Sequence, residues 1–370
     1  MLYLDANATE PLRPAARDAA LHAMDTVGNP SSIHRQGRAA RRILEDARES
    51  LASRFKSRPQ DIVFCSGATE ANALAIHALG AGRPILFGAT EHDAIRAAAA
   101  SGIEIPVTPT GLIDPAVLNT LLAQNPGALV CLMAANNETG VLHDIETAAK
   151  ICAAHGALLH VDAVQAAGRC AADWLALGAA SFAISGHKAG GPMGAGALFF
   201  APQHAERAAP LQKGGGQEMG RRGGTPSLPA IAGIAASFES PYDSAAIAAQ
   251  RDEIAAFCTR LGAVVIGQGA PRLPNTICLA LPGVRADTQL IALDMAGIAV
   301  SAGSACSSGK LAASHVLTAM GFRAALAGQA IRVSLPWNAP ATAAQIFAKA
   351  YEAMAARALR EQKSGVTQAA

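Results

Sequence analysis

Hydrophobic and polar positions follow two different periods along this chain. In the segment 34–55, apolar side chains recur at every fourth position between charged ones, at Ile43, Ala47, Leu51 and Phe55. That spacing gathers the apolar side chains on one helix face, and it predicts an amphipathic helix over the segment. Shorter apolar runs that lack this period indicate buried strands instead.

Strands are predicted where such a run is bounded by polar or turn-forming residues. The predicted strands are residues 62–66, 84–87, 128–133, 158–162, 181–185 and 197–200. Alanine-rich helical stretches separate them, and Asp114 followed by Pro115 is typical of a helix start. This alternation predicts an α/β fold in which helices cover both faces of a largely parallel sheet.

The pattern changes after about residue 240. The predicted elements there are helices at 244–261 and 341–359, strands at 273–281 and 331–335, and a Gly/Ser-rich loop at 301–309. They predict a smaller α+β domain. A length of 370 residues also favours two domains, because single cores stop growing near about 250–300 residues. Residues 363–370 are expected to lack regular structure.

Composition and charge argue against several classes of protein. The chain is 51% hydrophobic and 16% charged with a net charge of +2, which is typical of a soluble globular protein. The densest basic cluster, at residues 35–42, is interpreted as the solvated face of one helix, so we expect no nucleic-acid binding. No apolar run reaches the ~20 residues of a membrane span, and the N-terminus lacks a signal sequence, so we expect a cytoplasmic protein without membrane contact.

The seven cysteines are odd in number and widely spaced. This suits reduced thiols better than a disulfide framework, and no CxxC pair indicates a metal site. Cys131 lies within the apolar run ALVCLM and is expected to be an inert core residue. Cys306 differs, because the small polar and glycine residues around it suit an exposed, mobile loop.

The residues that follow the predicted strands carry the candidate chemistry, because ligands of parallel sheets bind beyond the carboxyl ends of the strands. Gly67, Ala68 and Thr69 begin a helix, where backbone N–H groups favour an anion such as phosphate, although such a turn is more often structural. Asp162 ends a strand, where its carboxylate could hold a pyridinium nitrogen protonated or cap the next helix. Gln165 could reach the same ligand.

A lysine follows the strand at 181–185. Ser185, His187 and Lys188 come directly after it, and glycines follow that allow a ligand or backbone to approach closely. A lysine held in such a place could form a Schiff base if its amine pKa is lowered. Taken alone, a loop lysine is more often simply solvated.

Many ordered segments together resemble the cysteine desulfurases, pyridoxal-phosphate (PLP) enzymes of the class V aminotransferase group. These segments are LDANATEP (4–11), GNPSSIH (28–34), SGATEAN (66–72), EHDA (91–94), ANNETG (135–140), HVDAVQ (160–165), SGHK (185–188), GGGQE (214–218), RRGGT (221–225), RLPNT (272–276), SAGSACSSG (301–309) and IRVSL (331–335). The resemblance spans almost the whole chain. It implies the PLP-dependent transferase fold type I, with a large PLP-binding domain at 13–240 that contains a mostly parallel seven-stranded sheet between helices. A small domain at 1–12 and 241–370 would carry a catalytic cysteine loop.

The resemblance also implies a role for each matching residue. Lys188 would bind PLP covalently and move the Cα proton, and His92 would stack on the ring and act as acid or base. The other cofactor contacts would be Asp162 to the pyridine nitrogen, Gln165 to the phenolic oxygen, and Ala68, Thr69, Ser185 and His187 around the phosphate. Thr225 would reach the phosphate of a second subunit, which implies a homodimer. Asn137 and Arg332 would bind the substrate carboxylate.

The implied reaction converts L-cysteine to L-alanine. Cys306 would attack as a thiolate, take the sulfur as a persulfide, and pass it to an acceptor such as an iron–sulfur scaffold protein. An iron–sulfur cluster or another sulfur-containing cofactor would be the final destination. No metal is expected in the site itself.

The sequence departs from the family pattern at several places. The departures are Ala6 for a second Asn, Glu10 for Thr, Gly223 for Ser, and Ala189, Gly190 and Met193 for a bulkier stretch after the lysine. Ala6 and Glu10 are not expected to perform the chemistry. The small residues after Lys188 predict more room in the pocket wall, and Gly223 predicts one hydroxyl fewer beside the phosphate.

Three alternatives stay open. A class V aminotransferase or selenocysteine lyase would share Lys188, Asp162 and Arg332 but would need no thiol nucleophile. A non-catalytic sulfur carrier or scaffold would have lost the cofactor site, which the intact set of site residues disfavours. A nicotinamide dehydrogenase would need a GxGxxG motif after an early strand, and the sequence has no such arrangement.

Overall fold

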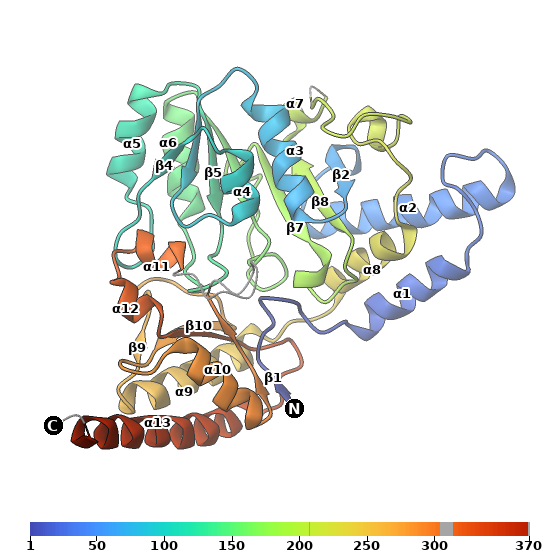
Figure 1. The fold of residues 1–370 in the computed structure, drawn as a ribbon. Coiled ribbons are helices and arrows are strands. Elements are labelled where there is room, and N and C mark those ends of the chain that lie inside the picture. Colours follow the sequence, from blue (N-terminus) through green and yellow to red (C-terminus); the bar gives the residue numbers. More distant parts are fainter. Residues whose placement is uncertain (207, 304–313, 369–370) are drawn as a thin grey trace.

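The computed structural model describes residues 1–206, 208–303 and 314–368, with side chains up to Ala358. Figure 1 shows a large sheet surrounded by helices and, below it, a second group of strands and helices that contains the C-terminal part of the chain. The first residues of the chain, drawn in blue, run between these two parts.

The large sheet has seven strands in the order β2-β8-β7-β6-β5-β3-β4. They are β2 (Ile62–Cys65), β8 (Gly196–Phe200), β7 (Ser181–Ser185), β6 (Leu158–Asp162), β5 (Leu129–Met133), β3 (Ile85–Gly88) and β4 (Ile103–Ile105). β8 is antiparallel to both of its neighbours, and the remaining pairs are parallel. The predicted α/β class with a mostly parallel seven-stranded sheet is confirmed.

Helices cover both faces of this sheet because its strands are apolar on both sides. One face packs against α3 (Ala68–Gly80), α4 (Asp93–Ala98) and α7 (Pro202–Ala205). The other packs against α2 (Arg35–Arg54), α5 (Pro115–Gln124), α6 (Ile145–Ala154) and α8 (Leu228–Glu239). Alternate residues of β2 divide accordingly, with Val63 and Cys65 in the first core and Ile62 and Phe64 in the second. α1 (Pro14–Asp25) lies beyond, against α8.

The second part is built on a four-stranded antiparallel sheet. Its order is β12 (Ser301–Ala302), β13 (Ala330–Ser334), β10 (Thr276–Ala280) and β9 (Val264–Val265). The helices α9 (Ser244–Arg260), α10 (Ala286–Met295) and α13 (Ala343–Gln368) accompany it, and β1 (Leu2–Tyr3) pairs in parallel with β11 (Ile298–Ala299). Leu4 shares a hydrophobic core with residues 247–355. This shared core supports the proposed domain division, in which residues 1–12 belong with 241–370.

Short elements complete the chain. They are the helices α11 (His315–Ala319) and α12 (Ala324–Ala327) and the 3-10 turns η1 (Pro59–Asp61), η2 (Gly186–Lys188) and η3 (Glu218–Gly220). The prediction that residues 363–370 lack regular structure was wrong for 363–368, since α13 continues to Gln368 through good helix formers such as Glu361, Gln362 and Lys363. In the described part of the chain, no helix has the length and apolar character that crossing a membrane requires.

Candidate active site

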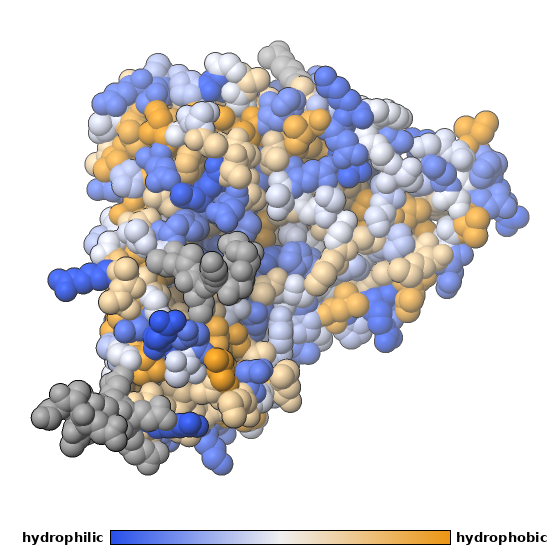
Figure 2. All heavy atoms as spheres, viewed as in Figure 1, coloured by the Kyte–Doolittle hydropathy of each residue, from blue (hydrophilic) through white to orange (hydrophobic). Residues whose placement is uncertain are grey.

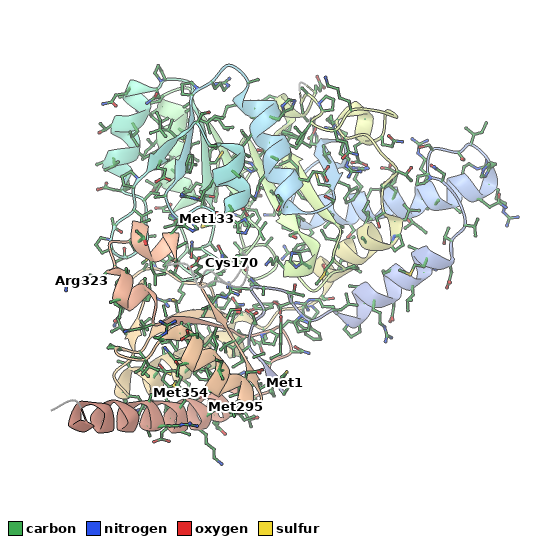
Figure 3. The ribbon with its side chains drawn as sticks, in the orientation of Figure 1. Met1, Met133, Cys170, Met295, Arg323 and Met354 are labelled. Carbon is green, nitrogen blue, oxygen red and sulfur yellow. The ribbon has the colours of Figure 1, made fainter. Side chains whose placement is uncertain are left out.

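A cavity of about 650 Å³ lies where the carboxyl ends of the parallel strands face the second sheet. Met133, which ends β5 and lines this cavity, lies at the lower ends of the strands in Figure 3. The predicted site residues that line it are Ala68, Thr69, His92, Asn137, Asp162, Gln165, Ser185, His187, Lys188 and Arg332. The fold therefore brings together residues that are up to 264 positions apart in the sequence (332 − 68).

Lys188 lies in η2, directly after β7. The turn is closed by a hydrogen bond from Ala189 N–H to Gly186 O at 2.9 Å, which holds the lysine at the strand end. Its Nζ donates to the main-chain oxygens of Asn7 and Ala8 at 2.6 and 2.8 Å. The amine is thus held at the cavity wall by the N-terminal segment.

Asp162 ends β6 and is buried. Its Oδ1 accepts the N–H of Val164 at 3.0 Å, and its Oδ2 accepts Nδ2 of Asn72 at 2.7 Å. Burial raises the pKa of Asp162, whereas the Val164 N–H, His92, Asn72 and Lys188 all act to lower that pKa. The carboxyl group therefore has fixed donors on both oxygens.

A chain of buried polar side chains continues behind Asp162. Asn72 Oδ1 lies 3.0 Å from Nε2 of His160, and His160 Nδ1 lies 2.8 Å from Oγ of Ser181. Because the amide nitrogen of Asn72 faces Asp162, the amide oxygen accepts a hydrogen bond from the Nε2–H of His160, and His160 Nδ1 accepts a hydrogen bond from the Ser181 hydroxyl. Burial lowers the pKa of His160 to about 3, so the ring is neutral. Neither Asn72 nor His160 was predicted, although both lie in segments that carry the family resemblance.

The start of α3 also lines the cavity. The N–H groups of its first turn, at Ala68 and Thr69, have no acceptor within the helix and point out of its N-terminus. β8 approaches this turn so closely that a Cβ at Gly196 would lie 2.6 Å from the carbonyl carbon of Gly67. Ser185, at the end of β7, lines the same region.

His187 adds a neutral imidazole to the cavity lining. Burial, followed by the charge of Lys188, lowers the pKa of His187 to about 4. Its Nδ1 lies 3.0 Å from Oγ1 of Thr9. A neutral ring at pH 7 offers one N–H donor, which suits contact with an anion.

Gln165 lies in the turn after β6 and is buried. Its Nε2 donates to Asn7 O at 3.1 Å, and its Oε1 accepts NH1 of Arg169 at 2.5 Å. Asn7 thus touches both predicted cofactor residues, Gln165 and Lys188, through the same carbonyl oxygen.

Arg332 extends from β13 into the cavity with a side chain that is 7% exposed. Its NH2 lies 2.7 Å from Oδ1 of Asp5, and its NH1 donates to Asn137 O at 3.1 Å. Ser301 in turn donates to the other oxygen of Asp5 at 2.8 Å. The guanidinium is therefore fixed beside Asn137, as binding of a substrate carboxylate requires.

His92 lines the cavity with an exposed ring. Its Nδ1 accepts the N–H of Ala94 and caps α4, so Nε2 carries the proton of the neutral ring. Glu91 is buried beside it and accepts the N–H of Met133 at 2.6 Å. Burial and then the neighbouring Asp162 raise the pKa of Glu91.

Thr225 is the one predicted site residue within the described part of the chain that does not line the cavity. It is exposed. Cys306 lies outside the described residues. Gly303, the last described residue before Cys306, lines the cavity together with Ser301 and Ala302.

Comparison with known proteins agrees with this geometry. Residues 2–346 match the model of the aminotransferase class-V family. A cysteine desulfurase of Frankia sp. is 38% identical over 365 residues, which cover 90% of this chain and 86% of the relative. The chain belongs to the cysteine desulfurase family. A NifS-like protein from Rickettsia africae has a similar structure, with a TM-score of 0.88, 34% identity and coverage of 96% and 99% of the two chains.

The fold expected from the resemblance, PLP-dependent transferase fold type I, is confirmed by this similarity. Another solved structure with a similar fold is described as SspA in complex with cysteine. It has a TM-score of 0.82 and 27% identity, and the match covers 91% of this chain and 99% of that one. Members of the cysteine desulfurase family depend on PLP.

The departures from the cysteine desulfurase pattern have local causes. Gly190 has φ +83°, and a Cβ there would lie 2.7 Å from Cγ of Arg13, so the space beside the lysine loop is filled by that arginine. The expectation of extra room after Lys188 was wrong at this position. Gly223 has no room for a side chain either, because its Cβ would lie 2.4 Å from Gly214 O. Met193 is exposed at the cavity.

Proposed function

We propose that this protein is a PLP-dependent cysteine desulfurase that converts L-cysteine to L-alanine and carries the sulfur as a persulfide on Cys306. One observation carries the proposal. A single cavity is lined by a strand-end lysine, a buried carboxylate and a fixed arginine, at Lys188, Asp162 and Arg332. Relatives with 34–38% identity bear the name cysteine desulfurase.

The residues present fit PLP. The cavity of about 650 Å³ is within the usual range for cofactor and substrate sites. The first-turn N–H groups of α3, Ser185 and the neutral His187 suit a phosphate group. Asp162, held by two N–H donors, suits a pyridine nitrogen, and Gln165 Nε2 suits a phenolic oxygen. When bound, PLP would supply an electron sink for negative charge that develops at the substrate Cα.

Each residue of the chain would then perform a separate task. Lys188 would hold the cofactor and carry a proton to and from the substrate Cα, and its contacts with Asn7 and Ala8 would keep the amine at the cavity wall. Asp162 would keep a proton on the pyridine nitrogen. Arg332 would orient the substrate carboxylate beside Asn137.

The thiolate of Cys306 would attack the sulfur of the substrate. An S–S bond forms while the C–S bond of the substrate breaks, and a proton replaces sulfur on the carbon that becomes the methyl group of alanine. Cysteine and a protein thiol thus yield alanine and a protein persulfide, with no external oxidant or reductant. Gly303 lines the cavity only three residues before Cys306, which supports this delivery.

A homodimer is part of the proposal. Thr225 is exposed outside the cavity, as a residue that serves a second subunit would be. Val27 and Ile33, which lie between α1 and α2, are 80% and 91% exposed. Figure 2 shows apolar side chains at the end of the molecule that the α1–α2 segment forms. Exposed apolar groups of this kind favour association with another protein chain.

Further parts of the proposal concern the destination of the sulfur. The acceptor of the persulfide would be an iron–sulfur scaffold protein or another sulfur-accepting protein, and the location would be the cytoplasm. The described cysteines are free thiols, in agreement with a reducing compartment.

The proposal is tested by measuring alanine formation from L-cysteine in the presence of PLP and a reductant. We expect catalytic turnover by the wild type and a loss of at least about 100-fold in Cys306→Ser, as for loss of an activated nucleophile. Cys258→Ala, which removes a thiol buried in α9, serves as the control and retains turnover. Full sulfur release by Cys306→Ser would instead favour a selenocysteine lyase-like or aminotransferase mechanism.

A further inference from the structure

Glu10 and Arg169 form an ion pair beneath the site, and neither matches a known cofactor contact. Glu10 Oε2 lies 2.8 Å from NH2 of Arg169, and the two side chains are only 2% and 3% exposed. A buried ion pair is weak support for stability, because desolvation of both charges offsets their attraction. The significance of the pair lies in the other contacts that the two side chains make.

Arg169 donates its other N–H groups to two residues of the site. NH1 donates to Gln165 Oε1 at 2.5 Å, and NH2 donates to the main-chain oxygen of Lys188 at 3.1 Å. Because the guanidinium occupies Oε1 of Gln165, Nε2 must lie on the other side of the amide, where it donates to Asn7 O. Arg169 thus holds this amide in one orientation together with Asn7 O.

Glu10 ties Arg169 to two further segments. Its Oε1 accepts the N–H of Trp337 at 2.5 Å, and its own N–H donates to His187 O at 2.8 Å. The carboxylate therefore fixes the position of the guanidinium relative to the segment after β13 and to the loop that contains the lysine.

Arg13 holds the same loop from its other end. Its Nε donates to Ala189 O at 3.0 Å, and its main-chain N–H donates to Gly190 O at 2.8 Å. The guanidinium also lies 4.9 Å from the ring centroid of Trp337. The small residues after the lysine are thus braced by a side chain from the N-terminal segment.

We infer that Arg169, held by Glu10, is a positioning residue for the cofactor site, which orients the Gln165 amide and fixes the main chain of Lys188. The inference rests on the proposed function, since it concerns how this chain holds PLP. With the amide in this orientation, Gln165 presents an N–H donor to an anionic phenolic oxygen. The inverted amide would present a carbonyl oxygen and repel it.

A double-mutant cycle on PLP binding tests the inference. Apoprotein of the wild type, Arg169→Lys, Gln165→Leu and the double variant is titrated with PLP, and the dissociation constant is read from visible absorbance. Lysine keeps the charge beside Glu10 but lacks the planar fork that reaches Gln165 and Lys188 at once. Thermal unfolding of each apoprotein shows that the variants are folded, and Arg260→Lys, an exposed residue of α9, is the control.

We expect Arg169→Lys to raise the dissociation constant for PLP about tenfold when Gln165 is present. In the Gln165→Leu background the same change should raise it less than about twofold, because the two contacting residues act as a unit. The pH midpoint of the visible absorbance of bound PLP should shift in both single variants and not in Arg260→Lys. Equal effects in the two backgrounds, or unchanged binding in folded Arg169→Lys, would overturn the inference alone. A wild type that binds no PLP would overturn the proposed function together with it.

Discussion

Asn72 donates from Nδ2 to Oδ2 of Asp162 over 2.7 Å, and both side chains are buried. The bond joins the first helix turns of α3 to the end of β6, so two separate βα units meet at one carboxylate. His160 fixes the orientation of the Asn72 amide from behind. The charge of Asp162 is therefore supported by a directed set of hydrogen bonds that no single motif reveals.

Asn72→Ala is expected to weaken this support. Loss of the amide leaves two buried atoms, Oδ2 of Asp162 and Nε2 of His160, without their hydrogen-bond partner, which costs about 2 kcal/mol of unfolding free energy. It also removes a donor that lowers the pKa of Asp162. With ¹⁵N-labelled PLP, the pyridine nitrogen should lose its proton at a lower pH than in the wild type, as followed by NMR.

Asn119→Ala is the matched control for this change. It deletes another Asn–His hydrogen bond, of 2.9 Å to His155, on an exposed surface. We expect its nitrogen titration to match the wild type. An identical titration in Asn72→Ala would show that Asn72 does not support the charge of Asp162.

Arg332→Lys should raise KM for cysteine about tenfold or more with a smaller change in kcat. Lysine cannot bind the substrate carboxylate through two parallel N–H bonds while also keeping the contacts to Asp5 and Asn137. Steady-state kinetics of alanine formation measure the effect. Arg323→Lys changes an exposed arginine that points away from the molecule in Figure 3, and it should leave KM unchanged. An unaltered KM in Arg332→Lys would remove this residue from the substrate site.

His143 makes stability depend on pH. In the described structure both of its ring nitrogens are buried without a hydrogen-bond partner, and burial lowers the pKa of His143 to about 4. In the unfolded chain this histidine has a pKa of ~6.5, so it is protonated below that pH, whereas in the folded chain it stays neutral down to about pH 4. Stability is therefore complete above about pH 6.5 and is lost as the pH falls toward about 4.

His143→Leu should remove this part of the pH dependence. Between pH 7.5 and pH 5, the loss of unfolding free energy should be about 2 kcal/mol smaller than in the wild type, since each pH unit below about 6.5 costs about 1.4 kcal/mol. Urea denaturation at the two pH values gives the comparison. His77→Leu, at an exposed position of α3, should retain the wild-type difference, and an equal loss in His143→Leu would contradict the account.

The strands that the sequence predicted are those whose apolar runs are buried on both faces, such as β5 and β6. β4 was not predicted, because it has three residues at the sheet edge with Ile103 and Glu104 exposed. The two-residue strands β1 and β11 are defined only by their pairing with each other across the fold. Local patterns contain no information on such pairing.

The sequence predicted the site residues that lie at strand ends within recognisable motifs, such as Lys188 and Asp162. Contacts between distant segments were not predictable. Glu10 and Arg169 are 159 positions apart, and nothing in either segment indicates the ion pair. The sequence at Gly190 predicts extra room, but the side chain of Arg13 fills that space.

The central claim is that sulfur leaves cysteine and arrives on Cys306. The most direct measurement is mass spectrometry of the PLP-loaded protein after incubation with L-cysteine in the absence of reductant, together with the amount of alanine released. The account predicts the mass of one added sulfur atom on the peptide that contains Cys306 and one alanine for each modified chain. Alanine formed without sulfur on Cys306, or sulfur found on another cysteine of the chain, would contradict it.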